Sequence, residues 1–472
     1  MKVINIGIDR IALYGKDSLL NKIPVEAVPI GWPEVRTFCT LNPMYELSEE
    51  EVYEKFRVKF PISPDELINT HTEGEISRLV NYCSQLATEH HLVSEGTEVV
   101  KNTVEYFVEN NIHFYYPVKC LANLWYFEEK PKLRENVAAA VKKGLCTVLF
   151  SYVLEGDINE EFRVQWLVDF GKLNNLNKRS FVVMHGNLRL QELLAQMENR
   201  GIEINFSYVS TIAFESHPLF IASPSERYQR DEVIRNAKTF PLDNTKKNSK
   251  YHFNVLNRRP HRHRVILFTE IKSNPELERT THISLGYFGN LRNKYVIEWI
   301  REAVDQNPKF KPNLEFALKH DFEKPTLLDV EFEFNHALRY NRQHYTESFC
   351  SVITETTCNP GNIFFSEKIF KPIYNLHPFL LLGNPHSLQK LKSLGYRTFD
   401  KWWDESYDLE ENYLLRIKAI SKVMLEISKW SLEKCNEVTI EMEEVLNHNF
   451  NTFIYNTRHR EFCEEIYNKQ FN

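Results

Sequence analysis

Ser366, Glu367 and Lys368 form a polar triplet between an apolar run and a helical pattern. A serine hydroxyl is well suited to cap a helix, which would place Glu367 and Lys368 in the first turn. A carboxylate is favourable at that positive end of the helix dipole, whereas an ammonium group is not. A lysine held there indicates an anion beside it, and the alternative is a lysine that points to water. Pro372 follows in the same pattern and should kink or shorten the helix.

A second charged stretch, residues 257–264, reads Asn-Arg-Arg-Pro-His-Arg-His-Arg. It follows an expected strand and opens an expected helix. The free N–H groups of a helix start, its dipole and nearby guanidinium groups together favour phosphate. Asn257, Arg259 and Arg264 are therefore candidate anion-binding residues, and the alternative is a solvated basic turn. Zinc binding by the two histidines is not expected, because their spacing is short and no acidic or thiol partner is adjacent.

Several common catalytic motifs are missing from the sequence. It contains no GxxxxGK[ST], no GxGxxG after a strand, no HExxH and no GxSxG. It also contains no Asp-x-Asp pair, which sugar transferases often use to hold a nucleotide through a divalent metal. A diphosphate bound here would have to be neutralised by arginine and lysine. We therefore expect no metal and no other cofactor.

Strand and helix patterns alternate along both halves of the chain, which is typical of parallel sheets covered by helices. The fold class is therefore α/β, and we expect two Rossmann-like domains that face a cleft. Strands are expected at 2–8, 146–153, 180–184, 202–209, 251–256, 282–287, 351–355 and 379–382. Helices are expected at 160–173, 188–199, 262–271 and 293–304, and from 366 onward.

A polar and basic segment from 223 to 250 reads as a linker between the two halves. It divides the chain into domains at 1–240 and 241–472. The first domain carries a helical insertion at about 40–140, and the second ends in helices. The insertion patterns are 76–86, 99–108 and 132–142, and the C-terminal ones are 412–423, 428–446 and 450–466. Because ligands bind at the carboxyl ends of strands in such sheets, the charged stretches should meet there.

The totals describe a well-packed protein of 472 residues with a formal charge of -6 and 42% hydrophobic residues. This charge gives no global attraction to nucleic acid or to acidic membranes. The eight cysteines are scattered and form no CxxC, so free buried thiols are expected rather than disulfides or zinc ligands. No signal peptide and no apolar span of membrane length is apparent. We expect a cytoplasmic protein of a bacterium or a virus-infected cell.

Residues 257–385 resemble the donor domain of the α-1,3-fucosyltransferase family, within the two-Rossmann-domain (GT-B) class. The motif of that family runs Glu-Asn, a polar loop, Thr-Glu-Lys, a helix, a strand and Gly-Ser-Pro. This chain has Glu355-Thr356, a loop through Asn362, the triplet 366–368, a helix, an apolar run and then Gly-Asn-Pro at 383–385. The family also has Ser-Asn followed by an arginine on the next helix, which resembles Asn257 and Arg264. Thr356 and a longer loop are departures from the family pattern.

The resemblance implies that the second domain, 241–472, binds a nucleotide-diphosphate sugar such as GDP-fucose, in an inverting reaction without an essential metal. It implies that Lys368 and Arg264 contact the diphosphate, Glu367 the ribose and Glu355 the region of the sugar. The candidate donor-binding residues are Asn257, Arg259, Arg264, Glu355, Asn362, Ser366, Glu367 and Lys368.

Transfer from such a donor also needs a general base for the hydroxyl of a glycan or other acceptor. An inverting displacement places that base opposite the nucleotide, so it should come from the first domain, on the acceptor side. Glu155, Asp157 and His185 lie at the ends of expected strands there, and Glu155 is our first choice. The alternative for each is a loop residue with no chemical role.

Two other readings remain open. The acceptor could be a hydroxylated base in DNA, with the basic residues between 227 and 264 along the phosphates, although the overall negative charge argues against nucleic acid. The chain could also be a non-catalytic protein that binds a nucleotide or sugar on a transferase scaffold. The sequence identifies neither the sugar nor the acceptor.

Overall fold

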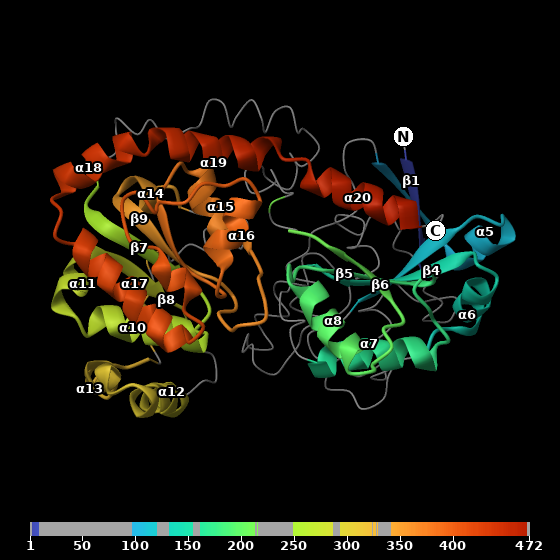
Figure 1. Ribbon diagram of the computed structural model, residues 1–472, viewed down its shortest axis with the longest axis horizontal. Helices are drawn as coiled ribbons and strands as arrows, with labels where there is room; N and C mark the ends of the chain where they lie inside the picture. Colours follow the sequence, from blue (N-terminus) through green and yellow to red (C-terminus); the bar gives the residue numbers. More distant parts are fainter. Residues whose placement is uncertain are drawn as a thin grey trace, which may run out of the picture.

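A computed structural model describes two parallel sheets with their covering helices (Figure 1). The residues it describes are 2–8, 97–119, 132–153, 161–212, 215, 249–286, 293–322, 324–326, 328 and 341–469. The α/β class expected from the sequence is confirmed by these two sheets. Most of the expected helical insertion and of the linker lies outside the described residues.

The first sheet has six strands in the order β2-β1-β3-β4-β5-β6, and every neighbouring pair is parallel. The strands are β1 Lys2–Ile8, β2 Thr97–Thr103, β3 Phe114–Lys119, β4 Cys146–Tyr152, β5 Phe181–His185 and β6 Ser207–Ser210. β1, β4 and β5 match expected strands. The expected strand at 202–209 begins only at Ser207, and the helix expected from 99 is a strand as far as Thr103.

Helices pack on the first sheet because successive side chains of a strand point to opposite faces. Val148 and Phe150 of β4 join one apolar cluster, while Leu149 between them joins a second. The helices here are α5 Val104–Glu109, α6 Glu135–Lys142, α7 Glu161–Leu173 and α8 Leu190–Asn199. β4, at the centre of the sheet, is therefore buried on both faces, as is typical of parallel sheets.

The second sheet has the order β10-β9-β7-β8 and is also parallel throughout. Its strands are β7 Tyr251–Asn257, β8 Thr281–Leu285, β9 Ser348–Thr354 and β10 Phe379–Leu382. The chain runs outward from β7 to β8 and then returns to the other side of β7 to form β9. The strand order therefore reverses between β7 and β9. In open α/β sheets such a reversal leaves a crevice outside the carboxyl ends of the two strands.

Helices surround the second sheet and share one large apolar core with it. They are α10 Arg262–Lys272, α11 Pro275–Thr280, α12 Asn293–Gln306, α13 Lys311–Ala317, α14 Gln343–Thr346, α15 Glu367–Tyr374, α16 Ser387–Ser393, α17 Tyr413–Ile427, α18 Leu432–Glu441 and α19 Glu443–Tyr455, with short 3-10 helices at Pro308–Phe310 and Ser406–Leu409. Among the described residues, no helix is both long enough and apolar enough to cross a membrane.

The last helix, α20 Arg458–Lys469, returns to the first sheet (Figure 1). Its residues Phe462 and Ile466 pack with Ile4 of β1 in the same apolar cluster. The hydroxyl of Tyr115 on β3 donates to the carbonyl of Ile466 at 2.5 Å. α20 lies within the range expected for the second domain, 241–472, but it packs on the first sheet, because its apolar face is complementary to a face of that sheet.

Candidate functional site

The candidate site lies where β7 and β9 end side by side, at the reversal of strand order. Asn257 is the last residue of β7, and Thr354 is the last residue of β9. The Thr354 hydroxyl donates to Oδ1 of Asn257, so the two strand ends are joined directly. Glu355 follows immediately, and both Asn257 and Glu355 are buried. The two charged stretches of the sequence do meet at this edge.

The first turn of α10 fixes the end of β9 through Arg264 and His263. Nη2 of Arg264 donates to the carbonyls of Thr354 (3.1 Å) and Glu355 (3.0 Å), and Nη1 donates to the carbonyl of Arg259 (3.2 Å). Nε2 of His263 lies 2.9 Å from the Glu355 carbonyl. Burial and the charge of Arg264 lower the pKa of His263, so this neutral ring donates there.

Arg264 is only 2% exposed, and burial lowers the pKa of its guanidinium group to about 10. Because both of its terminal nitrogens already bind carbonyl oxygens, the expected contact between Arg264 and a diphosphate is not supported by this placement. Its structural effect is to hold the loops after β7 and β9 together. Its Nε is buried without a hydrogen-bond partner.

Ser366, Glu355, Glu367 and Lys368 form one hydrogen-bonded group, which we call the Ser366 network. The Ser366 hydroxyl caps α15, as expected, by accepting from the Lys368 backbone N–H at 3.2 Å. It also accepts from Nζ of Lys368 at 3.2 Å and donates to Oε2 of Glu355 at 2.5 Å. Nζ of Lys368 donates in turn to Oε1 of Glu367 at 2.8 Å. Pro372 lies inside α15, which ends two residues later at Tyr374.

The charges beside the network are unequal in number. Burial alone would raise the pKa of Glu367, but the ammonium groups of Lys368 and Lys371 outweigh burial and hold that pKa at about 2. Burial, together with Lys368 and Arg258, lowers the pKa of Lys371 to about 8, against the opposing effect of Glu367. Glu367 is therefore ionised at neutral pH, and the two glutamates of the network, Glu355 and Glu367, lie among a larger number of cations.

The start of α10 adds to this positive potential. His261 is the N-cap residue of α10, and its side chain makes no capping hydrogen bond. The His261 side chain therefore does not offset the positive potential at the start of the helix. Burial and the charges of Arg264, Lys368 and Arg259 lower the pKa of His261 to about 3. The ring is therefore neutral at pH 7, and the site keeps an excess of lysine and arginine over carboxylate. Such a site favours an anion.

Arg416 of α17 fixes the loop between β9 and α15. The sequence analysis did not select this residue. Arg416 is fully buried and donates to the carbonyls of Cys358 (3.0 Å) and Gly383. Nδ2 of Asn384 donates to the carbonyl of Asn359 at 2.8 Å. The loops that follow β9 and β10 are thereby fixed to each other. A signal existed in the sequence, because Arg416 interrupts the apolar face of an otherwise amphipathic helix.

The same loop contacts the first sheet at the residues after β5. The backbone N–H of Leu188 donates to the Ile363 carbonyl at 2.8 Å, and Oδ1 of buried Asn187 accepts from the Ile363 N–H at 3.4 Å. A Cβ on Gly186 would lie 2.7 Å from the ring of Phe364, so only glycine allows this approach. The carboxyl ends of β5 and β9 therefore face each other across this contact.

Of the three predicted catalytic residues, only His185 is among those that the structure describes. Glu155 and Asp157 lie outside the described residues. His185 is the last residue of β5, but it is fully buried, with Nε2 at 3.2 Å from the Ser210 hydroxyl. Burial lowers its pKa to about 3, which makes it a weak base. The ring of His185 is therefore enclosed, with its centroid 5.8 Å from that of Tyr208, and its role as a base stays a prediction.

Three buried polar atoms at this edge lack a hydrogen-bond partner: Nδ2 of Asn257, Nε of Arg264 and Oδ1 of Asn362. Asn362 uses its other atom, Nδ2, to donate to the Thr357 hydroxyl at 3.3 Å. Leaving such groups unsatisfied costs about 1–3 kcal/mol each. The three atoms lie close to the Ser366 network, and a polar ligand bound there could form hydrogen bonds with them and remove this cost.

Lys371 is a further site residue that the sequence analysis did not select. It lies four positions after Glu367 on α15, and this spacing places both on one face of the helix.

Within the described part of the chain, no group of three or more His, Cys, Asp or Glu residues is arranged to hold a metal ion. No model of a known protein family matches the sequence, and no curated protein matches it significantly.

Proposed function

We propose that the protein is a glycosyltransferase that moves a sugar from a nucleoside-diphosphate sugar to a hydroxyl group of a glycan or another acceptor. The observation that carries this proposal is the position of Lys368. Its ammonium group is held at the start of α15 by Ser366 and Glu367, beside the point where the strand order reverses. An anion at that point would interact with a cation that is already in place.

The arrangement of charge supports a diphosphate in particular. Arg258 lies close enough to Lys371 to lower its pKa, and Arg259 lies close enough to His261 to lower the pKa of that ring. Several cations along one edge suit an extended anion with more than one charge. In this proposal the two sheets with their helices are the donor and acceptor domains of a GT-B transferase, and the fucosyltransferase-like motif makes GDP-fucose the first donor to test.

The proposed reaction is an inverting displacement. The acceptor oxygen attacks the anomeric carbon, the bond from that carbon to the diphosphate oxygen breaks, and the acceptor proton passes to a base. Negative charge grows on the departing diphosphate, so Lys368, Lys371 and Arg259 lower the barrier by electrostatic stabilisation. The base must approach from the opposite side of the sugar, and Glu155 and Asp157 are our candidates for that role.

A thermal-shift panel of GDP, UDP, ADP and CDP, with their sugars, tests the proposal. One diphosphate should raise the melting temperature, because a ligand at 100 times its Kd stabilises the folded state by about 2.7 kcal/mol. The matching nucleotide sugar should then be hydrolysed or transferred, and EDTA should leave the rate unchanged. Absence of a shift with every nucleotide would contradict the proposal. Binding without any turnover would instead indicate a non-catalytic protein.

A further inference from the structure

We propose that Glu355 is a positioning residue: through the Ser366 hydroxyl it fixes the ammonium group of Lys368, and protonation of its carboxyl breaks the bond between that ammonium group and Ser366. The ligand that Lys368 binds in this proposal rests on the proposed function. The sequence resemblance implies that Glu355 touches the sugar. The structure instead buries Glu355 completely, with Oε2 bonded to both the backbone N–H and the hydroxyl of Ser366.

The hydroxyl of Ser366 has no spare hydrogen-bonding capacity. A serine hydroxyl can donate once and accept twice. Here it donates to Oε2 of Glu355 and accepts from both the backbone nitrogen and Nζ of Lys368. The ammonium group therefore keeps its bond to Ser366 only while the hydroxyl hydrogen points to Glu355.

Protonation of Glu355 would reverse this arrangement. Oε1 faces only the Ser366 backbone N–H, which cannot accept a proton, so the new O–H would form on Oε2 and donate to the Ser366 hydroxyl. The serine hydrogen would then have to turn away, toward Nζ of Lys368. Two donors cannot face each other, so the ammonium group would lose its bond to Ser366.

Charged groups reach Glu355 from two helices. Lys368 and Glu367 face it from α15, and Arg264 approaches its carbonyl from α10. His263 on α10 is neutral, and Gly383 after β10 adds no charge there; a Cβ at Gly383 would lie 3.5 Å from Cγ of Glu355. Burial raises the pKa of Glu355, although Lys368 and Ser366 oppose this. The carboxyl therefore takes up a proton at a higher pH than an ordinary glutamate.

The test measures the Kd of the best-binding nucleoside diphosphate, and of inorganic pyrophosphate, by calorimetry. Ser366→Ala removes the link and should weaken binding about five- to tenfold at pH 7, the value of one hydrogen bond of average strength. Glu355→Gln presents an N–H where the protonated acid presents an O–H, so it should weaken binding similarly. Ser366→Thr keeps the hydroxyl and should restore binding to within about twofold of the original protein.

The pH profile separates positioning from mere support of the fold. As the pH is lowered from 7, the original protein should lose affinity as Glu355 is protonated, at a higher pH than an ordinary glutamate would require. Glu355→Gln should bind weakly at pH 7 and lose less affinity. Equal affinity of Ser366→Ala, Glu355→Gln and the original protein would overturn the proposal. So would an identical pH dependence in the original protein and Glu355→Gln.

Glu405 provides a matched control. We call each sheet with the helices that cover it a lobe. The Glu405 carboxylate is also buried, in the second lobe. It accepts from the Thr398 hydroxyl at 2.6 Å and from the backbone N–H of Phe399 at 2.7 Å. Glu405→Gln makes the same chemical change away from Lys368, so binding should stay within about twofold of the original. If Glu405→Gln weakened binding as much as Glu355→Gln, the effect would be one of general stability and the proposal would fail.

A second measurement does not depend on any ligand. If the original protein bound neither pyrophosphate nor any nucleoside diphosphate, the proposed function would fail. The Ser366 network would then be tested by trace acetylation of Lys368, measured by mass spectrometry. Loss of the bond to Ser366 should make that amine react about fivefold faster in Ser366→Ala and in Glu355→Gln. An unchanged rate in both variants would overturn the proposal.

Discussion

Arg458 at the start of α20 forms an ion pair with buried Glu215, although 243 residues separate them in the chain. Nε of Arg458 donates to Oε2 of Glu215 at 2.6 Å, and its Nη2 donates to Oε1. The hydroxyl of Tyr396 donates to the same carboxylate, and Nη1 of Arg458 reaches the carbonyl of Leu394 at 2.9 Å. Glu215 therefore joins α20, which covers the first sheet, to the loop after α16 of the second.

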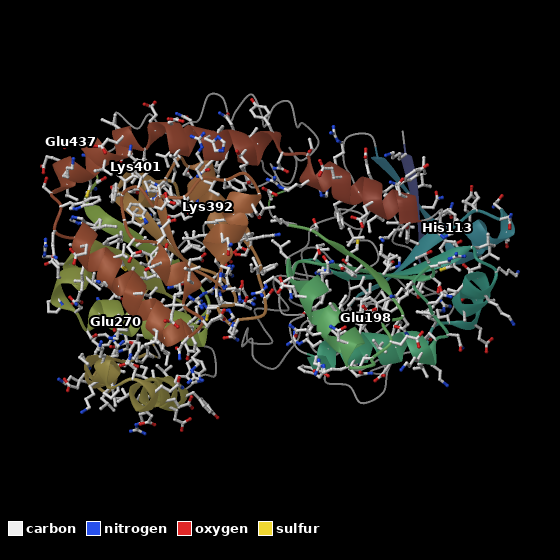
Figure 2. All side chains as sticks on the ribbon, in the orientation of Figure 1. His113, Glu198, Glu270, Lys392, Lys401 and Glu437 are labelled. Atoms are coloured by element: carbon white, nitrogen blue, oxygen red, sulfur yellow. The ribbon has the colours of Figure 1, made fainter. Side chains whose placement is uncertain are left out.

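Replacing Glu215 by alanine should destabilise the protein by about 3–5 kcal/mol, because Arg458 would be left partly buried without its counter-charge. The measurement is the shift of the urea unfolding midpoint. Glu198→Ala is the control, since its pair with Lys178 is exposed and lies on the surface of the first lobe (Figure 2). That variant should lose no more than about 0.5 kcal/mol. If the two substitutions shifted the unfolding midpoint equally, the proposed contribution of Glu215 to the free energy of unfolding would be contradicted.

Lys368→Ala should abolish the thermal shift given by a nucleoside diphosphate, because it removes the cation at the start of α15. Arg259→Ala should reduce the shift, with a loss of about tenfold or less in affinity. Lys401→Ala is the control: this lysine lies over the ring of Trp402 on the outer side of the second lobe, away from the first sheet (Figure 2). A full shift retained in Lys368→Ala would contradict the site.

Anion affinity should fall in alkaline solution. The pKa of Lys371 is lowered to about 8, so this side chain is charged at pH 7 and loses its proton as pH rises above 8. Above that pH, binding of the anion requires the Lys371 amine to take up a proton. The affinity should therefore fall by up to about tenfold per pH unit. Titrations of the same ligand at pH 7, 8 and 9 measure this. Lys371→Met should bind weakly at pH 7 and show no such fall; an identical fall in both proteins would count against Lys371.

Ionised Glu367 should stabilise the fold at neutral pH. Its pKa is about 2 in the folded protein, below the ordinary value of 4.5. A carboxyl whose pKa is lowered by folding adds stability above its unfolded pKa and loses it as pH falls toward the folded value. At pH 7 the free energy of unfolding of the original protein should therefore exceed that of Glu367→Gln by on the order of 3 kcal/mol. Urea midpoints should converge between pH 5 and pH 2, and a difference that persists at pH 2 would refute this cause.

The sequence predicted the local features of the site well. The Ser366 cap with Glu367 and Lys368 in the first turn depends on three adjacent residues and a short helix, and all three lie as expected. The buried strand β10 is also local, since Phe379–Leu382 is a continuous apolar run. Short-range rules of capping and strand composition are sufficient for such elements.

The sequence could not predict features that depend on distant segments. The burial of Arg264 requires the end of β9, 90 residues later, to bring two carbonyl groups to its guanidinium. Strand β2 has a spacing of apolar residues that also fits a helix, and its pairing with β1 decides the outcome. The destination of α20 depends on which apolar surface is left uncovered elsewhere, and that is a property of the folded first sheet.

The return of α20 to the first sheet has a consequence for the order of events during synthesis. Residues of β1 are synthesised well before those of α20, which follow after the whole second lobe. At roughly 5–20 residues per second, tens of seconds separate them. The face formed by Ile4, Tyr115 and Leu149 obtains the cover of Phe462 and Ile466 only at that late stage. The first lobe is therefore completed last, although most of it is made first.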